Sequence, residues 1–262
     1  MIKRQEFYSE IHYKIFLTEH DETIEFFKAR TLKSDSTEEE AALRSRFFQR
    51  LALHKLLAAY TVGEEISALL PLLEDLIDKY QIRQAKLAEY EQCPDVSPLA
   101  IDAYPYQYEE CIQVIGFCIL LHRTDLLGRF EQLIDNAGYA GNDTVYEDLL
   151  CKVLPDRHDI DQWYHDVYSP LVQAIYAKTK EDATNFLEQY CSEWYDAFTQ
   201  APWHGTHLQG EGGSYVGYWG IEAGAIAFLY DIDDSKIDHM VYPKALVEYP
   251  RNHKTPYREG SP

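Results

Sequence analysis

The chain has 262 residues, 46% of them apolar and 14% aromatic, which is enough to bury a substantial core and argues against a disordered chain. Its 44 acidic residues outnumber its 24 basic residues and give a net charge of −20. Direct nucleic-acid binding requires a basic surface that replaces counterions, so we expect no nucleic-acid partner. A basic protein is the complementary partner, because opposite electrostatic fields speed association.

Cysteine usage and the N-terminal segment predict a cytoplasmic protein. The five cysteines are odd in number, widely spaced and without a CxxC pair, which is typical of reduced thiols. The N-terminal segment is charged from Lys3 onward and lacks the apolar run of a signal peptide. The longest apolar stretch, residues 111–121, is too short to span a bilayer, so we expect no membrane partner.

Apolar residues recur at helical spacing along the first half of the chain. Ser36 and Glu39 form a capping box, which predicts a helix that begins there and ends before Gly63. Pro71 predicts a break or kink in the next helix, and three prolines within residues 93–106 predict a loop. The expected helices are 4–30, the Ser36–Gly63 segment, 64–90, the nearly all-apolar run 110–123, and one capped by Thr124 that extends through Ile134.

The second half of the chain continues the helical pattern after a candidate boundary at Gly138, Gly141 and Asn142. We therefore predict an N-terminal helical domain over 1–137 and a C-terminal helical domain over 143–262. The expected helices of the second domain are 144–153, 160–178, 180–199, 215–230 and 244–249. The predicted fold class is all-α, with two packed helical lobes of antiparallel helices joined by short loops.

The stretch YVGYWGIEAGAIAFLYDIDD, residues 215–234, contains the most conspicuous candidate site. We expect a packed helix in which Gly217, Gly220, Gly224 and Ala227 share one face and admit a close neighbour. Glu222 is then partnered by a base or hydroxyl, or it lines a cavity. Asp231, Asp233 and Asp234 lack the glycine and closing glutamate of a calcium loop, so a turn that bonds local backbone amides is favoured.

Histidine motifs give the alternative hypothesis, an HD-type all-α metal phosphohydrolase. The dipeptide occurs at His20-Asp21, His158-Asp159 and His165-Asp166, and these enzymes take His and Asp ligands from separate helices. His204 and His207 beside Glu211 supply too few ligands for zinc. The sequence has no GxSxG elbow and no phosphate loop. We therefore predict no catalytic residue, no cofactor and no metal.

Many positions of the last third form a specific pattern. They are residues 215–219, 222–223, 225–227, 229–235, 242–244 and 246–247, preceded by Trp194 and 201–203. This pattern resembles the C-terminal signature of the PoNi family, which are bacterial immunity proteins for polymorphic-toxin nucleases. Residues 1–135 are similar to the family's N-terminal helical domain in helix pattern and in their tyrosine-rich start. Gly220 and Gly224 depart from the alanines expected in the family's helix.

The resemblance implies a non-enzymatic protein. Its partner would be a cognate nuclease toxin, usually a DNase delivered by a secretion system such as type VI. The immunity protein would block this toxin in the producing cell. Residues 143–199 hold 12 acidic and four basic residues, so we expect the basic toxin to dock on this segment, beside the 204–214 loop. The candidate toxin-binding residues are Glu181, Glu188, Asp196, Glu211, Asp231, Asp233 and Asp234.

Overall fold

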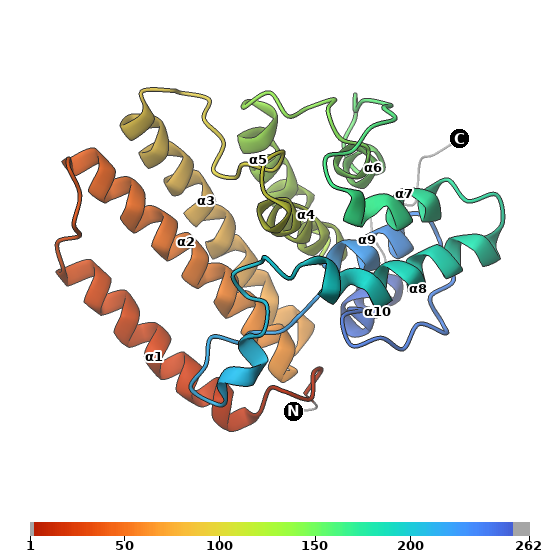
Figure 1. The fold of residues 1–262 in the computed structure, drawn as a ribbon, viewed down its shortest axis with the longest axis horizontal. Coiled ribbons are helices and arrows are strands. Elements are labelled where there is room, and N and C mark those ends of the chain that lie inside the picture. The colour runs from red at the N-terminus through yellow and green to blue at the C-terminus, as the bar shows by residue number, and fades with distance from the viewer. Residues whose placement is uncertain (1–2, 254–262) are drawn as a thin grey trace. The chain divides into compact units, whose positions relative to one another are not determined.

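The computed structural model describes residues 3–253, and this part of the chain contains ten α-helices, three short 3₁₀ helices and no β-strand (Figure 1). The predicted all-α class is therefore confirmed. The chain divides into two compact units. Unit 1 comprises the residues up to Pro98 together with Gly205–Gly217, and unit 2 comprises Leu99–His204 and the residues from Tyr218 onward.

Unit 1 is built on three long helices, α1 (Glu10–Ala29), α2 (Thr37–Val62) and α3 (Leu69–Glu91), of which neighbouring pairs pack against one another (Figure 1). The predicted start and end of α2 are confirmed: the Ser36 side chain accepts a hydrogen bond from the Glu39 amide at 3.0 Å. Gly63 ends the helix with a φ of 97°, which favours glycine. The α2–α3 core is made by buried apolar side chains such as Leu53, Leu56, Leu73, Leu76, Ile77 and Tyr80.

Two expectations for unit 1 were wrong in detail. The first helix begins at Glu10 rather than near residue 4, because the Ser9 side chain caps it by accepting from the His12 amide at 3.0 Å. Pro71 lies in the first turn of α3, which runs from Leu69 without a break there. Amides in a first helical turn have no partner within the helix, so a proline fits at that position.

The segment Gly205–Gly217 belongs to unit 1 although most of its sequence neighbours fold in unit 2. The Tyr215 hydroxyl donates to the side chain of Gln5, and the Thr61 hydroxyl donates to the Val216 carbonyl at 2.6 Å. Tyr215 is buried, and the segment also carries the short 3₁₀ helix Thr206–Gln209. These contacts fix the segment to the N-terminal part of the chain.

Unit 2 is centred on α4 (Pro105–Leu120), whose residues from Cys111 to Leu120 are all buried, as the apolar run predicted. The short helix α9 (Ile221–Leu229) packs on α4 where Gly116 allows close approach: a Cβ atom there would lie 2.9 Å from Ile221 Cγ2. The remaining helices of this unit are α5 (Thr124–Asp135), α6 (Thr144–Cys151), α7 (Ser169–Ile175), α8 (Lys180–Ala197) and α10 (Lys244–Asn252).

Two predicted helices of unit 2 are much shorter than expected. The segment predicted as helix 160–178 is helical only from the 3₁₀ turn Asp166–Tyr168 through α7. Its first residues instead bond to the start of α6, where the Tyr164 amide donates to Asp143 at 2.8 Å and the Gln162 amide donates to Thr144 at 3.1 Å. Long-range polar contacts therefore replace helical ones in this segment.

The second shortened helix is the one predicted over 215–230. Gly217 has a φ of 115°, outside the helical region, and the Gly220 amide donates to the Val241 carbonyl at 2.9 Å, so α9 begins only at Ile221. The expected shared glycine face was therefore wrong. Gly224 alone lies inside the helix, where α10 approaches it closely through Val247. Thr124 is likewise the first residue of α5 and makes no side-chain cap.

The compact units do not coincide with the predicted domains 1–137 and 143–262. The compact units are defined by contacts within the fold, whereas the predicted domains were defined by a boundary in the sequence. The domain division therefore stays a prediction.

Candidate functional site

The helix α8 presents an acidic face to solvent. Thr179 caps its start by accepting a hydrogen bond from the Asp182 amide at 3.0 Å. One side of the helix is buried through apolar residues that include Leu187 and Trp194. Glu181, Glu188 and Asp196 are all exposed. The predicted amphipathic character of this helix is thus confirmed, and three of the candidate acids lie on its solvent side.

The turn after α9 brings two more candidate acids beside α8. The Thr184 hydroxyl donates to the Asp233 carbonyl at 2.8 Å, and the Lys180 amine lies 3.8 Å from a carboxylate oxygen of Asp231. The Asp233 carboxylate accepts from the Ser235 amide at 3.0 Å, as expected of a turn whose side chains bond local amides. Asp231 and Asp233 are exposed, so their carboxylates extend the acidic face of α8.

Asp234 and Glu211 are placed differently from the other candidates. Asp234 is buried and accepts hydrogen bonds from the Tyr242 hydroxyl and from Arg251, the latter at 2.6 Å. Its carboxylate therefore ties the turn to α10 and its neighbours. Glu211 lies in unit 1, where it accepts from the Ser9 hydroxyl at 3.2 Å.

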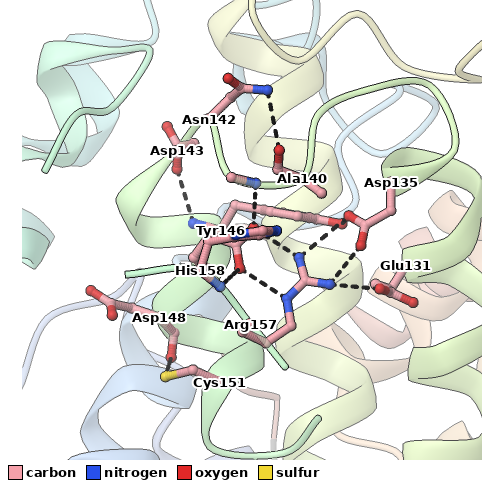
Figure 2. Close-up of polar contacts among 12 residues, drawn as sticks. Glu131, Asp135, Ala140, Asn142, Asp143, Tyr146, Asp148, Cys151, Arg157 and His158 are labelled. Carbon is pink, nitrogen blue, oxygen red and sulfur yellow. Dashed lines mark hydrogen bonds and ion pairs between the residues drawn. The ribbon is translucent and has the colours of Figure 1, made fainter. Parts of the chain in front are cut away.

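A buried guanidinium organises the start of α6, as Figure 2 shows. Arg157 is 6% exposed in its side chain and donates to Glu147 through Nε and Nη2, both at 2.9 Å. It also contacts Glu131 at 2.6 Å and Asp135 at 2.5 Å, both on α5. Glu147 in turn accepts from the Gly141 and His158 amides at 2.7 and 3.0 Å. This cluster joins two loops to two helices.

Three carboxylates share this one guanidinium, and the pKa values of the two on α5, Glu131 and Asp135, shift in opposite directions. Burial, followed by the neighbouring Asp135, raises the pKa of Glu131 to about 7. Burial also acts to raise the pKa of Asp135, but hydrogen bonds from Arg157, Glu131 and Tyr146 outweigh it and lower that pKa. Glu131 therefore carries a proton more readily than its neighbour, which reduces repulsion within the cluster.

The HD dipeptides do not assemble a metal site. His165 Nε2 lies 2.7 Å from the Ile101 carbonyl, whereas the ring of His158 lies against Gly141. His20-Asp21 belongs to unit 1. Within residues 3–253, no group of three or more His, Cys, Asp or Glu residues could hold a metal ion. The geometry gives the phosphohydrolase hypothesis no support.

Glu222 lies fully buried in unit 2, and its expected hydroxyl partner is present. Its Oε1 atom accepts from the Tyr190 hydroxyl at 2.5 Å and from the Trp194 indole at 3.2 Å. Its Oε2 atom and the Tyr168 hydroxyl are both buried without a hydrogen-bond partner. Burial raises the pKa of Glu222 to about 7. The carboxyl is thus held by neutral donors rather than by a base.

Glu109 on α4 is the second buried carboxyl of this cluster, and no pattern in the sequence indicated it. It accepts from the Gln113 amide at 2.8 Å, and burial, reinforced by Glu222, raises its pKa well above the usual range. Arg157 was also missed, since a lone arginine among many acids carries no motif. The role of Asp143 was predictable from the sequence, because an aspartate directly before a helix is a common N-cap. In the structure its side chain accepts a hydrogen bond from the Tyr146 amide at 2.9 Å.

These features define a class: an all-α protein whose exposed charge is mainly acidic and whose buried polar clusters hold loops and helices together. Residues 141–246 match the family model described as PoNe immunity proteins (PoNi), C-terminal, and this match confirms the resemblance predicted from the sequence. The match indicates an immunity protein directed against a nuclease.

The fold has a counterpart among solved structures. The crystal structure of protein PA2201 from Pseudomonas aeruginosa is similar with a TM-score of 0.69 and 19% sequence identity, and the alignment covers 94% of this chain and 90% of that one. At this identity the likeness concerns the fold alone. A search of curated proteins gave no significant match. Among the described residues, no helix has the length and apolar character needed to cross a membrane.

Proposed function

We propose that this protein binds and neutralises a cognate nuclease toxin, a DNase delivered by a bacterial secretion system such as type VI, in the cytoplasm of the producing cell. The observation that carries the proposal is the match of residues 141–246 to the PoNi C-terminal model. The protein acts by binding rather than by catalysis. Its partner is the toxin and not nucleic acid, because its net charge of −20 opposes contact with phosphates.

Electrostatics supplies the mechanism of inhibition. A nuclease needs a basic groove to bind its phosphate backbone, and an acidic protein that occupies the groove competes with that backbone directly. The docking surface we propose is the acidic face of unit 2, made by Glu181, Glu188 and Asp196 on α8 and extended by Asp231 and Asp233. Asp234 supports this face from beneath through its bonds to Tyr242 and Arg251. Glu211, in unit 1, is a separate candidate contact.

Co-expression with a candidate nuclease, sought among the genes that neighbour this one, tests the function. We expect cells that make the active nuclease to survive only when this protein is present. The purified protein should form a complex with a catalytically inactive form of that nuclease and stop DNA cleavage by the active form at equimolar concentration. If cells die equally with and without this protein and the two proteins do not associate, the proposed function is wrong.

A further inference from the structure

Helix α1 has an unusual buried face. Its buried residues are His12 and His20, which are 3% and 5% exposed. Its larger apolar side chains are only half-buried or exposed; Phe27, for example, is half-buried and stacks on Phe47 of α2 with ring centroids 3.7 Å apart. Histidine is the side chain that gains charge just below neutral pH. The best-buried positions of this 20-residue helix are therefore titratable ones.

His20 faces α2 beside another histidine. Its Nδ1 atom lies 3.3 Å from the exposed carboxylate of Asp21, and its Nε2 atom is buried without a hydrogen-bond partner. Burial, followed by the charges of Arg50 and His20, lowers the pKa of His54 on α2. Positive charge on His54 would lie beside a permanently charged arginine and near the buried ring of His20, at the contact between α2 and α1.

His12 occupies a similar position at the start of α1. Its ring centroid lies 4.4 Å from that of buried Tyr8, and its Nε2 atom is buried without a hydrogen-bond partner. Burial lowers the pKa of His12, although Glu211, Glu19 and backbone groups of Gly213 and Tyr215 act in the opposite direction. A charged imidazole here would remain mostly desolvated, so protonation favours conformations in which the ring reaches water.

We propose that α1 is an acid-released helix: charging of His12, and of His54 beside the buried His20, weakens its packing, so that α1 separates from the rest of unit 1 while α2 and α3 stay paired. The α2–α3 contact is apolar at Leu53, Leu56, Leu73 and Ile77, which do not titrate. Acid therefore acts on the attachment of α1 and leaves the adjoining helix pair intact.

The pH window follows from the direction of the shifts. A histidine with a lowered folded-state pKa contributes stability above its unfolded value of about 6.5, and that contribution is lost as pH falls toward the folded-state pKa. His12 and His54 both have lowered pKa values. One such histidine shifts the opening equilibrium about tenfold for each pH unit within the window. The release should therefore begin as the pH falls below about 6.5 and increase down to pH 5, because the folded-state pKa of His54 is lower still, at about 4.

Hydrogen exchange measured by mass spectrometry on the full chain tests this proposal, with rates corrected for the intrinsic effect of pH. In the wild type we expect protection of peptides from α1 to fall at least about tenfold from pH 7 to pH 5, while peptides covering Leu53–Val62 keep theirs. The variant His12→Gln/His54→Gln should lose most of this change, because it removes both histidines whose pKa values are lowered. The matched control His239→Gln, at a half-buried histidine of unit 2, should behave like the wild type.

Two outcomes would overturn the proposal. One is wild-type α1 protection that does not change between the two pH values, or that changes in parallel with α2. The other is an undiminished acid response in the double variant. If circular dichroism shows that the double variant is unfolded at pH 7, the single variants His12→Gln and His54→Gln take its place, and each should show a reduced response.

Discussion

Glu222 and Glu109 bring two carboxyl groups into the core of unit 2, where Tyr190, Trp194 and Gln113 donate hydrogen bonds to them. Neutral donors offset part of the cost of burying a carboxylate, and protonation removes the rest. Glu222, the acidic residue within α9, thus has a structural role within a packed core. The carboxylates of α8, by contrast, remain in water.

The raised pKa of Glu222, about 7, predicts how the stability of unit 2 depends on pH. A carboxyl with a raised folded-state pKa contributes stability that is full below the unfolded value and is lost as pH rises through the folded one. For Glu222 the loss should occur between about pH 4.5 and pH 7 and amount to ~3 kcal/mol. Glu222→Gln should lack this part of the pH dependence, because the amide does not titrate.

Urea unfolding followed by tryptophan fluorescence measures this effect in unit 2, because all four tryptophans lie there. Glu188→Gln serves as the control, since Glu188 is exposed. If Glu222→Gln retains the full wild-type difference between pH 5 and pH 8, Glu222 is not the titrating group.

Arg157 gives a second prediction at the residue scale. Arg157→Met leaves Glu131, Asp135 and Glu147 without their cation, so we expect unit 2 to lose about 3–5 kcal/mol of unfolding free energy. Arg157→Lys should fall between this variant and the wild type, because lysine keeps the charge but not the two-pronged geometry. Urea midpoints at pH 7 measure both, and equal stability of Arg157→Met and wild type would contradict the structural role of the cluster.

At the scale of elements, the contact of α9 with α10 depends on a glycine. A Cβ atom at Gly224 would lie 2.6 Å from Pro243 Cγ and 2.7 Å from Val247 Cγ2, closer than packed atoms allow. Gly224 therefore lowers the helix propensity of α9 but allows α10 to pack closely against it. Gly128 in α5 has no such contact, since a Cβ atom there would meet nothing within 4 Å.

This difference predicts opposite effects of one substitution. Gly224→Ala should destabilise unit 2 by about 1–3 kcal/mol, because overpacking outweighs the gain in helix propensity. Gly128→Ala should stabilise it by about 0.5–1 kcal/mol, because only the propensity changes. Thermal or urea unfolding of the two variants beside the wild type measures both values. A stabilising Gly224→Ala would show that α10 shifts away at little cost.

At the scale of the whole molecule, sequence reasoning succeeded where local physics decides. The cap at Ser36, the stop at Gly63 and the apolar stripe of α8 depend on neighbours within a few residues. It failed where distant contacts decide. Gly205–Gly217 joins unit 1 through bonds to Gln5 and Thr61, and residues near Tyr164 leave the helix to bond Asp143.

The candidate site divides along the same lines. The exposure of Glu181, Glu188 and Asp196 follows from one amphipathic helix, so it was predictable. That Asp231 and Asp233 lie beside that helix depends on the Thr184 contact across 49 residues of sequence, which no local pattern specifies. The burial of Asp234 by Tyr242 and Arg251 could not be predicted from the sequence for the same reason.

The last prediction concerns the rate at which the toxin associates. Exposed carboxylates on α8 contribute little to folding, but they add to a field that attracts a basic partner from a distance. The field is screened over about 8 Å at physiological ionic strength. Reversing Glu181, Glu188 and Asp196 to lysine should therefore slow association with the inactive nuclease at least about tenfold at low salt and flatten its salt dependence. Far-UV circular dichroism should stay unchanged, because these side chains are exposed.

A control variant separates this local effect from overall charge. Reversing Glu22, Glu91 and Asp95 to lysine adds the same charge at exposed positions of unit 1. Stopped-flow association rates at several salt concentrations then compare the two variants with the wild type. If both variants slow association equally, net charge alone steers the encounter. If the α8 variant keeps the wild-type rate and salt slope, the toxin docks elsewhere, and the acid-rich segment 66–142 becomes the next surface to reverse.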